Sequence, residues 1–385
     1  MILSIDDLYN LYYGGQYVVG NARYLRKTFS EDDDEYDKRL LWSTYVNYQR
    51  KIVNTYLSYI FYGKVIVEPA QPLDLESIAR KLALHSLIGG VAYLFEADQQ
   101  IGVFDARQVS CRDKGIYAIR GKSGDTVIDT INMTVTGKDA AGNTVTEDLA
   151  PGRFVVCKWN EDGSSLIEDT ALMNLKLYNM ASQLDMHYDR SLFYFLYGPS
   201  LGQDQKLVPG QYVSVAQGEQ QPGIVQVDSA AAERMRKEME LVKMEMAVTV
   251  SLEEEFSDEV KVESGVALTV KKLDINAIIN SAAFSITKAI NEAAEHYSRQ
   301  YKEPLQSLKL DPLLKITTPE EEYGKYKFLL EYAGTEEVVK QVQKNIVMHC
   351  LAGEVKPEVL DSLLESIDRD GGAKLFQSQG FLQMS

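Results

Sequence analysis

Residues 168–189 read EDTALMNLKLYNMASQLDMHYD, and residues 227–246 read VDSAAAERMRKEMELVKMEM. Apolar side chains recur at helical spacing in both stretches, which predicts two long helices over residues 166–190 and 229–248. Asp228 and Ser229 can cap the second helix. At a rise of about 1.5 Å per residue, each helix is about 30 Å long. The apolar positions are Leu177, Met180, Ala181, Leu184 and Tyr188 in the first stretch, and Met235, Met239, Val242 and Met246 in the second.

The segment between these two helices has a different composition. Residues 198–223 contain three prolines, five glycines and the short apolar stretch from Tyr212 to Ala216. Proline and glycine at this density disfavour a continued helix. The composition predicts a compact turn or a β insertion.

Helices and strands are also expected outside this region. Helical spacing predicts helices over residues 40–62, 73–88 and 275–301, the second ending at Gly89 and Gly90 and the third capped by Asp274. Short β-branched or aromatic segments, separated by turn residues, predict an antiparallel β region. These segments are residues 91–96, 101–104, 115–120, 126–136, 144–147 and 153–159. The fold class is therefore α+β, mainly helical.

The C-terminal part is predicted to be a separate helical appendix. Pro304, Pro312 and Pro319 punctuate a linker, after which residues 320–332, 335–352 and 356–368 have the pattern of three short helices. Residues 371–385 are polar and rich in glycine, so we expect this tail to be ordered only by a partner, if at all.

Composition limits the classes of function. The chain has 385 residues, 45% of them hydrophobic, and its 40 Lys and Arg against 56 Asp and Glu give a formal charge of -16. This balance argues against a broad basic face that grips DNA, so any DNA contact must be local or weak. Three well-separated cysteines favour a reducing cytoplasm over a disulfide framework. No apolar run is long enough for a membrane span.

Catalytic and metal-binding patterns are absent from the sequence. Gly121-Lys122-Ser123 resembles the end of a phosphate-binding loop, but Ile116 stands where that loop requires glycine, so a β-turn is expected. The acidic run at residues 31–37 lacks the central glycine and terminal glutamate of a calcium loop and is expected to be a solvated loop before a helix. The four histidines are expected to be structural or exposed. We therefore expect no enzyme activity, no cofactor and no metal site.

One segment carries a family resemblance. ESGVALTV, residues 263–270, precedes the helix at residues 275–301 and looks like a segment that recurs in portal proteins of tailed bacteriophages. The order of elements supports the resemblance: an aromatic helix, a β region, a long helix, the LVPGQ insertion and a second long helix. Together these parts span residues 40–301. The sequence resembles the portal subclass with short wings and a small clip.

The resemblance implies a division into functional parts. Residues 1–165 would form a wing, 166–190 and 229–248 the two stem helices, and 191–228 the clip between them. Residues 249–272 would be the tunnel-loop region, 273–310 a wing helix, and 319–385 a C-terminal crown with its tail. The resemblance implies a homo-oligomeric ring of twelve subunits at one capsid vertex, through which double-stranded DNA passes during packaging and ejection. Its partners would be terminase, the major capsid protein and a head-tail adaptor, and it would be assembled in the host cytoplasm and reside in the virion.

The resemblance also directs attention to particular side chains. Lys261, Lys271 and Lys272 are the cations nearest to the expected tunnel loop, where a ring of one or more of them could touch phosphates; ordinary solvated lysines are the simpler interpretation. The apolar stripe Met235, Met239, Val242 and Met246 is expected to pack between neighbouring helices in a subunit interface. Two other functions stay open: a capsid or tail structural protein without a DNA channel, and a cytoplasmic enzyme with an unrecognised pocket.

Overall fold

The structure is a computed structural model of the chain. It describes residues 2–28, 31–69, 72–121, 124–138, 142–191, 195–199, 212–215, 223–225, 230–256 and 265–312, with residues 340, 344, 365 and 367. The described part combines helices with mainly antiparallel strands, so it is α+β as predicted.

The four N-terminal α-helices each begin after a polar residue whose side chain caps the helix. The elements are α1 (Ile5–Tyr13), the short 3-10 helix η1 (Gly15–Tyr17), α2 (Asp33–Trp42), α3 (Tyr48–Tyr62) and α4 (Leu75–Gly89). Ser4 and Asp7 form a capping box at α1, and the carboxylate of Asp74 accepts the Ser77 N–H at 3.1 Å at the start of α4. Gly90, with φ of 77°, ends α4 as expected.

The helix predicted over residues 40–62 is wrong in its first part. Residues 43–47 separate α2 from α3, and the side-chain oxygen of Asn47 accepts the Arg50 N–H at 2.8 Å, which starts α3 anew. Ser43 is buried at the break and its hydroxyl lies 2.8 Å from that of Tyr178. Trp42 ends α2 and is 77% exposed.

The acidic run at residues 31–37 is also different from the expected solvated loop. Asp32 caps α2 by accepting the Glu35 N–H at 2.8 Å, and the acids Asp33, Asp34 and Glu35 occupy the first turn, where the helix dipole favours negative charge. Glu31 is buried. The run is thus the start of a helix.

The strands of the described residues form four sheets. The first strands are β1 (Lys64–Glu68), β2 (Val91–Ala97), β3 (Gln100–Asp105), β4 (Val109–Asp113), β5 (Ile116–Ile119) and β6 (Thr126–Asp129). They are followed by β7 (Thr134–Lys138), β8 (Thr144–Asp148), β9 (Phe154–Lys158), β10 (Phe195–Pro199), β11 (Tyr212–Val215), β12 (Gly223–Val225) and β13 (Ser307–Asp311). The strand orders are β3-β2-β9, β4-β5-β6-β7-β8, β1-β13 and β11-β10-β12.

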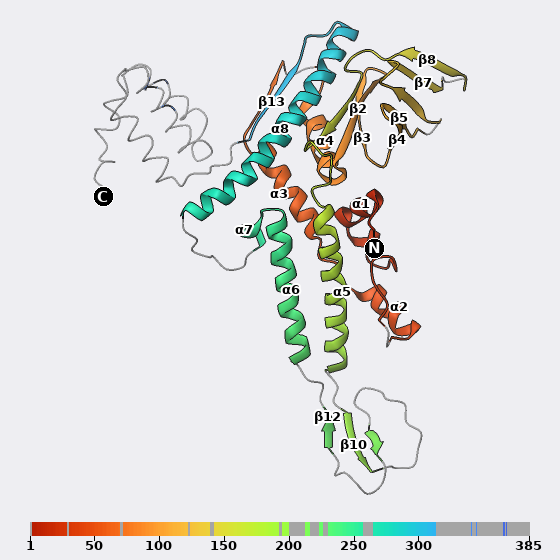
Figure 1. Ribbon diagram of the computed structural model, residues 1–385, viewed down its shortest axis with the longest axis vertical. Helices are drawn as coiled ribbons and strands as arrows, with labels where there is room; N and C mark the ends of the chain where they lie inside the picture. Colours follow the sequence, from red (N-terminus) through yellow and green to blue (C-terminus); the bar gives the residue numbers. More distant parts are fainter. Residues whose placement is uncertain are drawn as a thin grey trace. The chain divides into compact units, whose positions relative to one another are not determined.

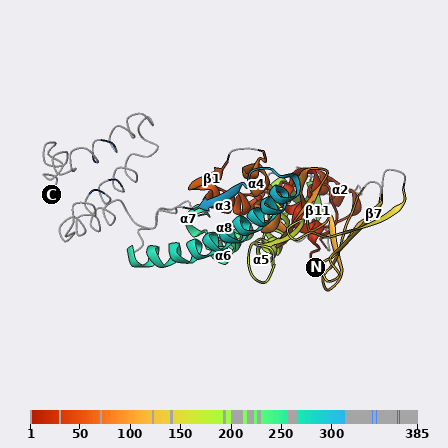
Figure 2. The same ribbon diagram turned by 90° about the horizontal axis from the view of Figure 1, so that it is seen from above.

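Several strands depart from the sequence prediction. The single segment 126–136 is two strands, because the Asp129 carboxylate accepts the N–H groups of Ile131 and Asn132, each at 2.9 Å, and closes a turn. Strand β4 was not predicted. Strands β1 and β13 were not predicted either; they pair with each other across most of the chain, Lys64 opposite Asp311. In Figures 1 and 2, this pair and the five-stranded sheet lie on opposite flanks of α4.

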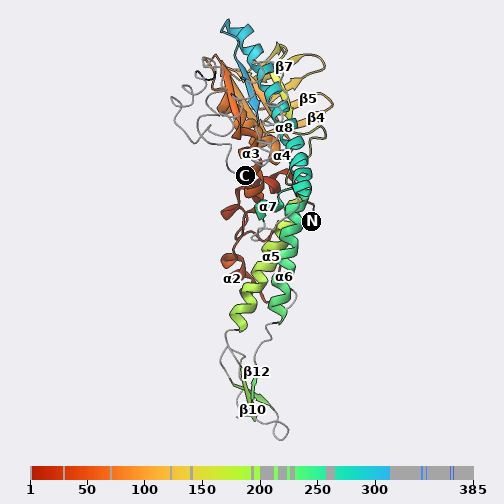
Figure 3. The same ribbon diagram turned by 90° about the vertical axis from the view of Figure 1, so that its left-hand side faces the viewer.

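The long helices are α5 (Glu168–Ser191), α6 (Ala230–Thr249) and α8 (Gly265–Tyr301), with a short helix α7 (Glu253–Phe256). Helices α5 and α6 confirm the two helices predicted there, and β10, β11 and β12 confirm a β insertion between them. Figures 1 and 3 show α5 and α6 running side by side. Helix α8 begins ten residues before the predicted start at Ile275, so Asp274 lies inside the helix and does not cap it.

Two hydrophobic cores hold the described elements together. Alternate residues of β2 serve different cores: Ala92 and Leu94 join the main core with α1, α3, α4, α5, α6 and α8. Tyr93 and Phe95 face a smaller core shared with β4 to β7 and β9, which includes Ile128. Since successive strand residues point to opposite faces, β2 joins the helical body to the five-stranded sheet.

The chain divides into two compact units. The first comprises residues 1–264 and 273–314, and the second residues 265–272 and 315–385. Apart from the start of α8 and the four isolated positions, the second unit, with the expected crown, lies outside the described residues.

Candidate functional site on the long helix pair

Polar contacts at successive turns attach α5 to the N-terminal helices. Thr170 Oγ1 donates to Gln49 Oε1 at 3.0 Å, and Asn174 Nδ2 donates to Tyr45 Oη at 2.6 Å. One turn further along α5, the hydroxyls of Tyr178 and Ser43 lie 2.8 Å apart. One more turn along, Ser182 Oγ accepts a hydrogen bond from Arg39 Nη1 at 3.2 Å. Burial raises the pKa of the Tyr45 and Tyr178 phenols, so both stay protonated as neutral hydrogen-bonding groups. The α2–α3 segment therefore runs antiparallel to α5 along one of its sides.

Apolar contacts attach α6 to another side of α5. Val242 and Met246 are 2% and 0% exposed and belong to the main core, and Met239 is partly buried against it. An ion pair at 2.7 Å joins Lys176 of α5 to Glu238 of α6, and both side chains are about half exposed. At the C-terminal end of α6, Tyr56 Oη donates to the Val250 carbonyl at 2.8 Å.

The burial of α6 corrects the interpretation of its apolar stripe. Val242 and Met246 are covered within one chain, so they cannot pack in a subunit interface; Met235 and Met239 are partly buried. These side chains are buried because the same chain already supplies an antiparallel partner helix, α5. The stripe thus holds the helix pair together.

A different set of apolar side chains lies exposed on the helices. Leu172 on α5 is 48% exposed, and on α6 Leu241 and Val248 are 61% and 57% exposed. Leu41 and Trp42, at the end of α2, are 70% and 77% exposed. These residues are separate from the buried stripe, and sequence periodicity alone did not mark them.

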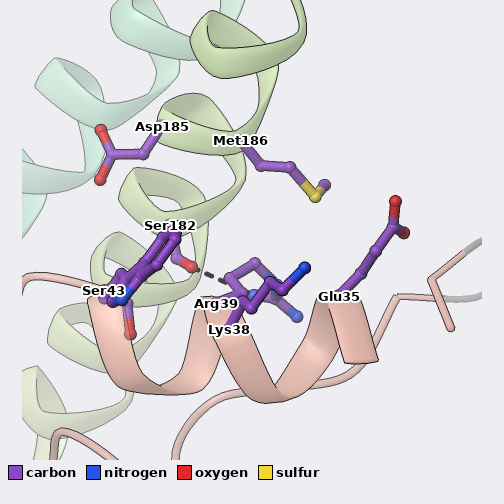
Figure 4. A pocket seen from close by; sticks show the side chains of 8 residues that line it. Glu35, Lys38, Arg39, Ser43, Ser182, Asp185 and Met186 are labelled. Atoms are coloured by element: carbon purple, nitrogen blue, oxygen red, sulfur yellow. Dashed lines mark hydrogen bonds between the residues drawn. The ribbon is translucent and has the colours of Figure 1, made fainter. Parts of the chain in front are cut away.

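A pocket of about 350 Å³ lies between α2 and α5 (Figure 4). It is lined by Glu35, Lys38, Arg39, Trp42, Ser43, Ser182, Asp185 and Met186. The Arg39 guanidinium is engaged by groups around it: Nε and Nη2 donate to Glu31 at 2.6 and 2.8 Å, and Nη2 also donates to the Arg26 carbonyl. The hydrogen bond from Arg39 lowers the pKa of Glu31, which is therefore ionised. The pocket's central cation thus serves the packing of α2 on α5.

Other candidate residues occupy structural positions. His296 Nε2 lies 3.4 Å from the buried Glu96 carboxylate, and His85 Nδ1 lies 3.4 Å from Tyr9 Oη. The Gly124 N–H donates to the Gly121 carbonyl at 3.3 Å, whereas Lys122 and Ser123, where a β-turn is expected, lie outside the described residues. Within the described ranges, no three His, Cys, Asp or Glu side chains gather as a metal site would require.

The three lysines singled out from the sequence are only partly placed. Lys261 lies outside the described residues. Lys271 and Lys272 lie in the second turn of α8, not in a loop, because the helix begins at Gly265. The region expected to be a tunnel loop, residues 249–272, therefore ends in helix.

None of the helices in the described ranges combines the length and hydrophobicity that crossing a lipid bilayer requires.

Comparisons with known proteins give the following. No protein-family model and no curated protein matches the chain. Among solved structures, it is similar to a chain from the virion of a native gene transfer agent particle, with a TM-score of 0.45 and 12% identity over 88% of this chain and 99% of that one. It is also similar to a chain from the neck of an empty particle of that kind, computed with C6 symmetry, with a TM-score of 0.42 and 10% identity over 83% and 95%. At these values the likeness does not by itself assign a role.

Proposed function

We propose that this chain is a portal subunit. Copies of it form a ring at one capsid vertex, through which double-stranded DNA passes during genome packaging and ejection. In this proposal terminase and a head-tail adaptor bind the ring, the major capsid protein surrounds it, and the driving force comes from a separate motor. In this proposal the ring has twelve subunits.

The helix pair of α5 and α6 carries the proposal. Its helices have 24 and 20 residues, and they enclose the β10–β12 insertion between them. Copies of such a pair, arranged about an axis parallel to the helices, make a wall about 30 Å high at about 1.5 Å per residue. The apolar side chains exposed on α2 and α6 give neighbouring copies a reason to associate.

Charge is compatible with a conduit. Each cation on a channel wall strengthens sequence-independent binding to phosphates, so a wall that lets DNA slide needs few of them. The formal charge of -16 fits this requirement. Lys261, Lys271 and Lys272 are candidates for the limited phosphate contact that remains.

Electron microscopy of the purified chain tests the proposal. We expect closed rings with an axial hole of roughly 20 Å or more, wide enough for duplex DNA given its groove dimensions. Sheets, tubes or shells without a channel would favour the capsid or tail structural protein instead. Monomers or dimers alone at micromolar concentration would refute the portal.

A further inference from the structure

Two buried side-chain amides at the contact between α3 and α5 each keep one polar atom unpaired. Gln49 is 0% exposed; its Oε1 accepts from Thr170 Oγ1, but its Nε2 has no hydrogen-bond partner among the described residues. Asn174 is 1% exposed; its Nδ2 donates to Tyr45 Oη, but its Oδ1 has no partner within the same ranges. Almost all buried polar groups in native proteins are hydrogen-bonded to protein or to ordered water, because an unpaired one is strongly unfavourable.

The orientation of the Asn174 amide is fixed by its surroundings. The Tyr45 hydroxyl donates to the Leu11 carbonyl at 3.0 Å, so toward Asn174 this hydroxyl can only accept. The nitrogen of Asn174 must therefore face Tyr45, which leaves the oxygen Oδ1 as the unpaired atom.

The Gln49 amide leaves one atom unpaired in either orientation. As it stands, Thr170 Oγ1 donates to Gln49 Oε1 at 3.0 Å and lies 3.2 Å from the Ile167 carbonyl, and Nε2 is unpaired. With the amide turned over, Nε2 would donate to Thr170, whose hydroxyl would donate to Ile167, and Oε1 would be unpaired. A group beside Gln49 that can both accept and donate would satisfy either orientation.

The spacing of the two amide contacts suits one small molecule between them. Thr170 and Asn174 lie one turn apart on α5, about 6 Å along the helix at about 1.5 Å per residue. A water molecule that makes a hydrogen bond of about 2.8–3.0 Å on each side spans nearly the same length.

We propose that one water molecule binds in the buried contact between α3 and α5, where it accepts from Gln49 Nε2 and donates to Asn174 Oδ1. The chemistry favours water over an ion. Both ligands are neutral amides, and burial raises the pKa of the neighbouring Tyr45 phenol, which therefore stays protonated. Buried waters typically occupy polar sites of this kind, with two to four partners.

The water joins two separate contacts into one hydrogen-bond network across three helices. In order, the network consists of the Leu11 carbonyl of α1, Tyr45, Asn174, the water, Gln49, Thr170 and the Ile167 carbonyl just before α5. Buried networks of this kind hold their members in a single arrangement when every group is satisfied. The site lies within one chain, so it stands or falls separately from the proposed ring.

A crystal structure or an electron microscopy map of the full-length chain that shows ordered waters tests the site directly. We expect a peak at about 2.8–3.0 Å from both Gln49 Nε2 and Asn174 Oδ1. A direct hydrogen bond between the two amides, or a map in which side chains fill the space between them, would overturn the proposal.

A double-mutant cycle tests the same site in solution. Gln49→Met and Asn174→Leu each remove one ligand of the water, and we expect each to lower the midpoint of urea unfolding. The double variant should lower the midpoint by less than the sum of the two single shifts, because no amide is then left unpaired. Asn280→Leu and Gln300→Met, at two exposed amides of α8, are the matched controls, and their shifts should be small and additive. Additive shifts for Gln49 and Asn174 as well would count against a shared water.

Discussion

The ion pair between Arg39 and Glu31 offers a quantitative test of how α2 is held on α5. The two side chains are 5% and 0% exposed, and two hydrogen bonds of 2.6 and 2.8 Å join them. Arg39 also contacts Ser182 on α5. Replacing Arg39 with leucine leaves the Glu31 carboxylate buried, and within the described part of the chain its remaining hydrogen-bond partners are the Thr28 N–H and hydroxyl.

We expect Arg39→Leu to lower the free energy of unfolding by about 3–5 kcal/mol, the usual cost of leaving one partner of a buried pair behind. The variant with leucine at both positions should be more stable than Arg39→Leu, because no buried charge is then unpaired. The effect has a defined pH dependence. The hydrogen bond from Arg39 lowers the pKa of Glu31 in the folded state. The stabilisation is therefore fully present at pH values above the ordinary pKa of a glutamate, and it is lost as the pH falls toward the lowered pKa of the folded state.

Urea denaturation followed by circular dichroism at pH 7 measures these free energies. The ion pair of Arg112 and Asp125, whose side chains are 52% and 43% exposed, provides the control. Arg112→Leu should lower the free energy of unfolding by less than about 1 kcal/mol. A loss for Arg39→Leu no larger than that of the control would refute the reasoning. So would a double variant less stable than Arg39→Leu.

Three further predictions concern other parts of the chain. Met246→Ala should lower the free energy of unfolding by about 2–5 kcal/mol, because the Met246 side chain is 0% exposed. Val248→Ala provides the control: Val248 is 57% exposed, and its replacement should change the free energy of unfolding by less than about 0.5 kcal/mol. Equal effects of the two substitutions in urea denaturation would contradict the packing of α6. Burial raises the pKa of Asp7, but hydrogen bonds from Arg23, Ser4 and Tyr24 outweigh it and hold the pKa well below its usual range. Asp7→Asn should therefore lower the free energy of unfolding by about 1–3 kcal/mol at pH 7. The difference in this free energy between the variant and the original chain should become smaller as the pH falls from 5 to 2. A difference that stays constant over this range would show that the charge of the carboxylate is unimportant. Burial raises the pKa of Cys157 to about 12, whereas Cys111 is exposed. A thiol reagent should therefore label Cys111 in the folded chain and Cys157 only after unfolding, which peptide mass spectrometry can measure. Rapid labelling of Cys157 in the folded chain would mean that its strand opens readily.

Local sequence patterns predicted those elements whose boundaries depend on local chemistry. Helices α5 and α6 follow from their apolar spacing, and α4 ends where Gly90 adopts a positive φ. The break between α2 and α3 was missed, because apolar and aromatic residues continue through it. Only the capping role of Asn47, one polar residue among many, could have indicated it.

Long-range pairing was beyond the reach of local patterns. Strand β13 lies in what reads as a proline-punctuated linker, and it becomes a strand by pairing with β1. The Asn291 side chain supports it from α8 by accepting the Leu308 N–H at 2.7 Å. The same limit applies to the candidate site: spacing identified the apolar stripe on α6 but could not show that α5 covers it.

The two long helices are held by different kinds of contact, and this difference has a mechanical consequence. Helix α5 is tied to the N-terminal helices by hydrogen bonds at successive turns, and such bonds resist sliding because they are directional. Helix α6 rests on α5 largely through apolar side chains, which tolerate small shifts, and is tied at its C-terminal end by Tyr56. A force applied along the helix pair would therefore be resisted mainly by the hydrogen bonds of α5, while α6 would rotate about its attachment at Val250.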